Sequence, residues 1–139
     1  MSEKGSDSKD FHNYCDNKGS TLILVKTTNN KIFGGFTPLN WKNNGGYIYD
    51  ESNQTFIFSL NLMKKYDMIN NKGKAIYCDS RGPNFGACDI GLSYNLKNGE
   101  SYANKQCNFL SNNNLELTGG KGINDTFKTE EFEVFKVIY

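Results

Sequence analysis

Acidic side chains near the end of the chain have the type and spacing for acid–base chemistry. Glu130, Glu131 and Glu133 lie close together, and Asp89 follows a glycine-rich segment. Two carboxylates can exchange protons with a substrate when their surroundings separate their pKa values. In a strand, Glu131 and Glu133 would share one face and Glu130 would lie on the other. A solvated face that pairs with nearby lysines is the alternative interpretation of this cluster.

The thiols and the single histidine are the second set of candidates. His12 and Cys15 are three residues apart, so on a helix they could touch as a base and a nucleophile do. No third group that would orient His12 is evident in the sequence. The four cysteines lack the short spacing of zinc ligands: they are Cys15, Cys78, Cys88 and Cys107. We therefore expect reduced thiols, and neither a metal nor a cofactor.

Two glycine-rich segments, residues 82–86 and 119–122, could suggest phosphate-binding loops. Neither continues into a Gly-Lys-Ser/Thr motif or a predicted helix, so the helix N-terminus that would hold a phosphate is missing. Glycines in strands and turns more often permit a close backbone approach or a positive φ. We expect this structural role for a set of five: Gly34, Gly35, Gly82, Gly86 and Gly119.

Composition fits a single domain. The chain has 139 residues, of which 37% are hydrophobic and 14% aromatic, and its 16 basic and 15 acidic residues give a net charge of +1. That balance, with Arg81 as the sole arginine, does not favour nucleic-acid binding. No apolar run reaches the roughly 20 residues of a membrane span, and the polar start lacks the apolar stretch of a signal peptide. We expect a cytoplasmic monomer.

Hydrophobic patterns predict a mainly β fold. We expect a polar tail over residues 1–10, one domain over residues 11–139 and a short helix over residues 8–18. Segments 21–27 and 131–139 are apolar on both faces, which predicts interior strands. Further strands are expected at residues 31–37, 55–62, 65–70, 74–78, 88–94, 101–109 and 115–118. This order favours a two-sheet antiparallel β-sandwich flanked by one or two short helices.

Side-chain alternation also predicts which residues are buried. Phe56, Phe58 and Leu60 would form a core face, and Ile90 and Leu92 another. Residues 65–70 and 74–78 would pair as a hairpin around the turn at residues 70–73. Trp41 lies in a loop, where it would anchor the loop to the sheet or contact a partner.

An ordered series of short motifs resembles the TLDc domain of protist and plant proteins. It runs from Phe11-His12-x-x-Cys15-Asp16 through Ile32-Phe33-Gly34-Gly35-Phe36-Thr37, Trp41, Ala75-Ile76-Tyr77-Cys78 and Gly82-Pro83-x-Phe85-Gly86 to Glu131-x-Glu133-Val134-Phe135. The resemblance covers roughly residues 11–137. It implies a β-sandwich with short helices, resistance to oxidative damage, and binding and regulation of the vacuolar proton-pumping ATPase.

Two functions follow from these observations. The first is a non-enzymatic interaction module that binds the vacuolar ATPase and is recruited through it to a vacuolar or endolysosomal membrane. Its contact surface would comprise Trp41, Pro83, Asn84, Phe85, Glu130, Glu131 and Glu133. The second is a small enzyme or direct antioxidant that uses Asp89, Glu131, Glu133 or the thiols. An exposed apolar patch would favour the module, and a concave pocket holding those carboxylates would favour the enzyme.

Overall fold

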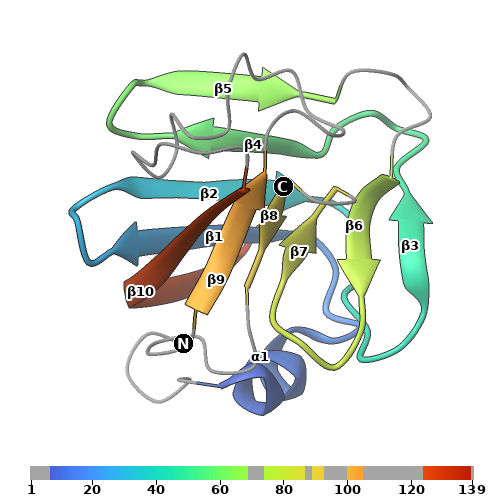
Figure 1. Ribbon diagram of the computed structural model, residues 1–139. Coiled ribbons are helices and arrows are strands. Elements are labelled where there is room, and N and C mark those ends of the chain that lie inside the picture. The colour runs from blue at the N-terminus through green and yellow to red at the C-terminus, as the bar shows by residue number, and fades with distance from the viewer. Residues whose placement is uncertain (1–6, 69–73, 87–88, 93–99, 105–123, 139) are drawn as a thin grey trace.

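The computed structural model describes residues 7–68, 74–86, 89–92, 100–104 and 124–138. These residues form one helix and one ten-stranded antiparallel sheet with the order β3-β6-β7-β8-β9-β10-β1-β2-β4-β5 (Figure 1). The elements are α1 (Ser8–Cys15), β1 (Thr21–Thr27), β2 (Ile32–Thr37), β3 (Gly46–Tyr49), β4 (Phe56–Ser59), β5 (Lys64–Asp67), β6 (Lys74–Cys78), β7 (Asn84–Phe85), β8 (Ile90–Gly91), β9 (Glu100–Asn104) and β10 (Asn124–Lys136). The mainly β class is confirmed, whereas two separate sheets are not found among the described residues.

The long last strand, β10, makes the sheet continuous. Its residues 124–128 pair with β9 and its residues 129–136 pair with β1. Thr129 faces Thr27 and Glu131 faces Lys26, so Glu130 is an extra residue in the ladder. A bulge of this kind bends a strand and reverses its alternation. Buried side chains accordingly change from odd positions, at Phe127 and Thr129, to an even one at Phe132. One bent strand thus joins the strands into a single sheet, where the sequence had predicted two sheets.

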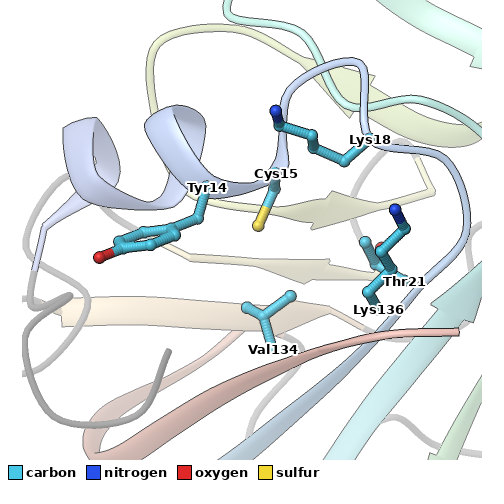
Figure 2. A pocket seen from close by; sticks show the side chains of 6 residues that line it. All are labelled: Tyr14, Cys15, Lys18, Thr21, Val134 and Lys136. Carbon is cyan, nitrogen blue, oxygen red and sulfur yellow. The ribbon is translucent and has the colours of Figure 1, made fainter.

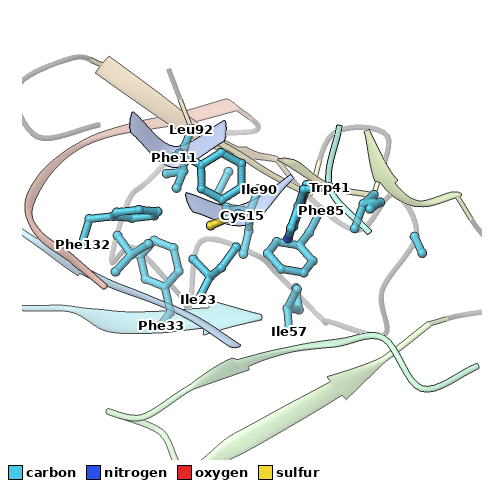
Figure 3. Packing of buried hydrophobic residues seen from close by; sticks show 14 of the residues in the cluster. Phe11, Cys15, Ile23, Phe33, Trp41, Ile57, Phe85, Ile90, Leu92 and Phe132 are labelled. Carbon is cyan, nitrogen blue, oxygen red and sulfur yellow. The ribbon is translucent and has the colours of Figure 1, made fainter. Parts of the chain in front are cut away.

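Buried side chains from α1 and from both parts of this curved sheet pack together in the core (Figure 3). The rings of Phe33 on β2 and Phe127 on β10 meet edge to face, 5.2 Å apart. Phe85 of β7 lies against β2, and a Cβ on Gly35 would come within 2.5 Å of its ring. Gly35 therefore permits a close approach across the core, as predicted. Gly34 plays a similar role, because a Cβ there would lie 1.8 Å from the Ile23 carbonyl oxygen.

Helix α1 and the loop containing Trp41 close one side of the core. Asp7 caps α1 by accepting a hydrogen bond from the Asp10 N–H at 2.9 Å. The helix ends at Cys15, earlier than predicted, and the Asn17 N–H donates to the Trp41 carbonyl at 3.0 Å. Trp41 is 1% exposed, packs edge-on against Phe11, and donates from Nε1 to Thr21 Oγ1 at 2.8 Å. The predicted anchor role of Trp41 is confirmed.

The predicted core face of β4 is wrong. Ile57 is fully buried, whereas Phe56 and Phe58 are half-buried and Leu60 is 44% exposed. The strand carries apolar side chains on both faces, and pairing places Ile57 opposite Gly35 on the core side. Ile90 and Leu92 are buried as predicted: their exposed fractions are 3% and 2%.

Strand pairing departs from the prediction at β5 and β6. These strands do not form a hairpin: β5 pairs with β4 at one edge of the sheet, and β6 lies between β3 and β7 near the other edge. A tight turn at Met63, whose φ is 53°, makes β4 and β5 neighbours instead. The β1–β2 hairpin is confirmed, with Asn30 at φ 65° in its turn.

The remaining predicted structural glycines are Gly82, Gly86 and Gly119. Gly86 adopts φ 69°, a conformation that favours glycine. Gly119 and the predicted strand at residues 115–118 lie outside the described residues. Within the described part of the chain, no helix is long and apolar enough to cross a membrane.

Candidate functional site

Four predicted contact residues lie inside the protein. Trp41, Asn84 and Phe85 are at most 3% exposed, and Pro83 is also buried. Phe85 packs edge-on against Trp41 with ring centroids 5.6 Å apart, and Asn84 Nδ2 donates to the Gly82 carbonyl at 2.8 Å. The prediction that these side chains form a contact surface is wrong, because all four are buried in the core.

The acidic residues of β10 do reach the surface. Glu130 and Glu131 are exposed, and Glu133 is half-buried. Glu131 lies opposite Lys26 and Glu133 opposite Leu24 on β1, so these two carboxylates share a face as predicted. Asp89 has an exposed fraction of 0%. The carboxylates named for acid–base chemistry are therefore divided between the interior and an open sheet face, and they do not converge on one pocket.

The face of the sheet that carries Glu131 and Glu133 is apolar over much of its area. Pairing places Phe135, Leu22, Phe36 and Phe56 side by side across four strands. Phe135 is 46% exposed, and the other three are half-buried. The Phe36 and Phe56 rings are 5.5 Å apart, centroid to centroid. We call this surface the outer face, comprising Leu22, Leu24, Phe36, Phe56, Phe58, Glu131, Glu133 and Phe135.

Charged side chains border the outer face. Glu131 and Glu133 lie on its β10 side, and Lys26 of β1 lies opposite Glu131 on the same face. Lys65 of β5 lies on the other side, with its Nζ 4.6 Å from the centre of the Phe56 ring. A cation over an aromatic ring adds modest stability at an exposed position. The apolar centre and charged borders resemble the core and rim of protein–protein interfaces.

His12 connects α1 to the loop after β6. Its Nδ1 lies 2.7 Å from Asp16 Oδ1, and its Nε2 lies 2.8 Å from the Arg81 carbonyl oxygen. A carbonyl only accepts, so Nε2 carries a proton and donates to it. The second nitrogen faces a carboxylate. Both ring nitrogens are thus used in holding α1 in place, and His12 is not free to act as a base for Cys15.

The described thiols are also unsuited to nucleophilic chemistry. Cys15 and Cys78 are free and buried, each with an exposed fraction of 2%. Burial, with a contribution from Asp16, raises the pKa of the Cys15 thiol to about 12. Burial likewise raises the pKa of Cys78. Because the thiolate is the reactive form, neither residue fits a peroxide scavenger; Cys88 and Cys107 lie outside the described residues.

Asp50 is a buried carboxylate at the start of the β3–β4 connection. It accepts hydrogen bonds from the backbone N–H groups of Ser52, Gln54 and Thr55 at 2.9, 2.9 and 2.7 Å, and from the hydroxyls of Ser52 and Thr55. Burial raises the pKa of this carboxyl, but the hydrogen bonds outweigh burial and leave it below its usual value. This carboxylate fixes a turn. The sequence alone gave no indication of it beyond an Asp-x-Ser pattern typical of turns.

A shallow hollow lies between the end of α1 and the ends of β1 and β10 (Figure 2). Its volume is about 260 Å³, and it is lined by Tyr14, Cys15, Lys18, Thr21, Val134 and Lys136. None of the carboxylates predicted for catalysis lines it. Among the described residues, no group of three or more His, Cys, Asp or Glu side chains is placed to hold a metal ion.

Comparison with known proteins identifies one family. The model of the TLDc domain matches residues 1–138, nearly the whole chain. A search of curated proteins found no match.

Proposed function

Because the chain belongs to the TLDc domain family, which is associated with oxidation resistance, we propose that it is a non-enzymatic interaction module. The outer face is its contact surface, and the vacuolar proton-pumping ATPase is the first candidate partner. The domain acts as a cytoplasmic monomer that reaches the membrane surface through this partner. The choice of partner rests on analogy with the family rather than on the geometry.

The observation that supports a docking role is the row of half-buried and exposed apolar side chains across β10, β1, β2 and β4. Burying aromatic side chains at a protein interface contributes strongly to affinity. Phe135 has the most to gain from a partner, since it is 46% exposed at the end of that row. Contiguous exposed apolar patches on folded domains often mark interaction sites. The complementary surface would be apolar at its centre.

The charged borders add a preference for orientation. Glu131 and Glu133 would face basic groups of the partner, whereas Lys65 already pairs with Asp67 at 3.1 Å. Such charges at the rim of an interface mainly determine specificity and the association rate. The partner surface is therefore expected to carry a positive charge on the side that meets β10.

The test is a binding assay between the folded chain and purified, immobilised subcomplexes of the pump. Phe135→Ser removes the exposed aromatic ring, and Met63→Ser is its control, because Met63 is an exposed apolar residue outside the outer face (83%). Glu131→Lys reverses a border charge, and Glu51→Lys reverses an exposed charge elsewhere.

We expect Phe135→Ser and Glu131→Lys each to weaken binding by at least about tenfold, in the range of interface hot spots. The two control variants should bind like the wild type. No binding by the folded wild-type chain would remove this partner. Equal binding by all variants would place the contact surface outside the outer face.

A further inference from the structure

The hollow beside α1 is lined by uncharged and basic side chains. Cys15 and Val134 form the uncharged part, which we call its floor, and Lys18 and Lys136, both exposed, form the basic part, its rim (Figure 2). Tyr14, which is 57% exposed, adds a phenol to the same surface. The thiol of Cys15 stays protonated at neutral pH, since burial raises its pKa to about 12. The floor therefore carries no charge that would repel an anion.

Lys136 departs from the pattern of its strand. On the core side of β10, Phe132 is buried and Val134 is half-buried. Lys136 is the next residue on that side, opposite Thr21, yet it carries a charge. Its side chain is exposed to solvent and lines the hollow. The position and charge of Lys136 therefore make this end of β10 a candidate for binding an anion.

Lys18 brings a second ammonium to the same hollow from a different element. It follows α1, and its backbone N–H donates to the Cys15 carbonyl at 3.3 Å. The ion pairs formed by the described residues involve neither Lys18 nor Lys136. Two like charges that line one hollow repel each other, and an anion between them would relieve that repulsion.

We propose that this hollow is a binding site for a carboxylate that carries a short apolar stem. The carboxylate lies between the Lys18 and Lys136 ammonium groups, and the stem rests on Cys15 and Val134. A volume of about 260 Å³ equals that of about nine water molecules at roughly 30 Å³ each. This size suits a stem of about four or five carbons by the same volume estimate.

The surroundings favour a single negative charge over a phosphate. The hollow adjoins the C-terminal end of α1, where the helix dipole is negative. Asp16, the next residue, adds a carboxylate nearby, although His12 pairs with it. These features oppose a doubly charged ligand more strongly than a singly charged one.

A carboxylate with an apolar stem can be a free small molecule or the C-terminus of a protein chain. The test titrates the isotope-labelled full chain with pentanoate, with pentanamide and with inorganic phosphate, and follows NMR signals of Cys15 and Val134. A short peptide ending in valine is compared with its C-terminal amide. Saturation by pentanoate identifies a free carboxylate as sufficient. Saturation by the peptide acid alone identifies a protein C-terminus as the ligand.

Either result supports the site, provided that the neutral amides do not bind. Saturation by neither acid, or equal shifts with pentanamide or phosphate, would overturn the proposal. The Lys18→Gln/Lys136→Gln double variant should bind at least about tenfold more weakly. Lys18→Arg/Lys136→Arg should restore binding, because it restores both charges.

The matched control is Lys9→Gln/Lys128→Gln. Lys9 lies on α1 and Lys128 on β10, both are exposed, and neither lines the hollow. This variant also loses two positive charges, but outside the hollow, and it should bind like the wild type. Equal weakening in both double variants would show attraction to net charge alone and would also overturn the site. The hollow lies on the core side of β10, so the outcome does not depend on the outer face or on its partner.

Discussion

The two faces of β10, β1, β2 and β4 carry similar apolar residues in very different surroundings. On the core side, Val25, Phe33 and Ile57 are at most 1% exposed. On the outer face, Leu22 and Phe36 remain half-buried and Phe135 is 46% exposed. Alternation in a strand shows that two faces exist, whereas the packing of other elements decides which is covered. Among the described residues, α1 and the strands beyond β10 cover only one of them.

Polar groups differ between the faces in the same way. On the core side, Thr37 and Thr55 are joined by a hydrogen bond of 3.0 Å, and Thr55 donates to Asp50 at 2.7 Å. On the outer face, Glu131 is exposed to solvent. Buried polar groups need partners, while exposed charges are already hydrated. Changes on the core side should therefore alter folding stability, and changes on the outer face should alter binding.

The largest expected effect is that of Trp41→Ala. Removing this buried ring should reduce the free energy of unfolding by about 3–5 kcal/mol, through lost packing and a cavity. Trp41→Phe keeps most of the packing but loses the hydrogen bond to Thr21, and should cost less. Chemical denaturation measures both. A loss below about 1 kcal/mol for Trp41→Ala would contradict the anchor role.

Substitutions of the neighbouring residues Ile57 and Phe58 compare the contribution of the two faces to stability within one strand. Ile57→Ala should cost about 2–5 kcal/mol, as expected for a fully buried residue. Phe58→Ala should cost about 1–2 kcal/mol, because the half-buried ring removes only about half as much apolar surface from water as a fully buried aromatic side chain does. Equilibrium unfolding in denaturant gives both values. The distinction between the faces fails if Phe58→Ala lowers the free energy of unfolding more than Ile57→Ala does.

Asp50→Asn should have an intermediate effect that depends on pH. Loss of charge-assisted hydrogen bonds should cost about 1–3 kcal/mol near neutral pH. The pKa of Asp50 is lowered in the folded protein, so its stabilisation is present above the ordinary value of 3.8 and is lost as pH falls through the folded pKa. The stability difference between wild type and Asp50→Asn should therefore shrink below about pH 4. A difference that stays constant down to pH 2 would contradict this role.

Phe135→Ser should have the smallest effect on stability. Substitutions at exposed positions usually change the free energy of unfolding by less than about 0.5 kcal/mol. Its thermal unfolding midpoint should stay within a few degrees of the wild type, while its binding to the partner weakens by at least about tenfold. A large destabilisation would mean that Phe135 belongs to the folded core, and the outer face would lose its most exposed apolar anchor.

Local sequence patterns predicted those elements whose strand and turn residues lie next to each other in the chain. β1 was predicted with its observed bounds, since seven mostly branched residues precede the Asn29–Asn30 turn. The anchor role of Trp41 and the shared face of Glu131 and Glu133 also followed from residue type and alternation. The interior position of the last strand was correct too, because β10 lies between β9 and β1.

Long-range pairing could not be predicted from such patterns. The bulge at Glu130 contains no glycine or proline that would indicate it in the sequence. It nevertheless allows β10 to pair with β9 on one side of the bulge and with β1 on the other. Strand β3 lies in a glycine- and asparagine-rich stretch that did not suggest a strand. Phe56 and Phe58 of the outer face were assigned to the core, because exposure depends on what packs against a strand. The hollow likewise combines Lys18 and Lys136, which are far apart in the sequence.

Carboxyl labelling of the free and partner-bound chain tests the docking role of the outer face most directly. A carbodiimide-activated amine modifies exposed carboxylates, and mass spectrometry reads each site. Labelling of Glu131 and Glu133 should fall when the chain binds the pump subcomplex, while that of Glu51, which is exposed elsewhere, stays the same. Unchanged labelling of Glu131 and Glu133 in the complex, with protection at Glu51 instead, would contradict docking through the outer face.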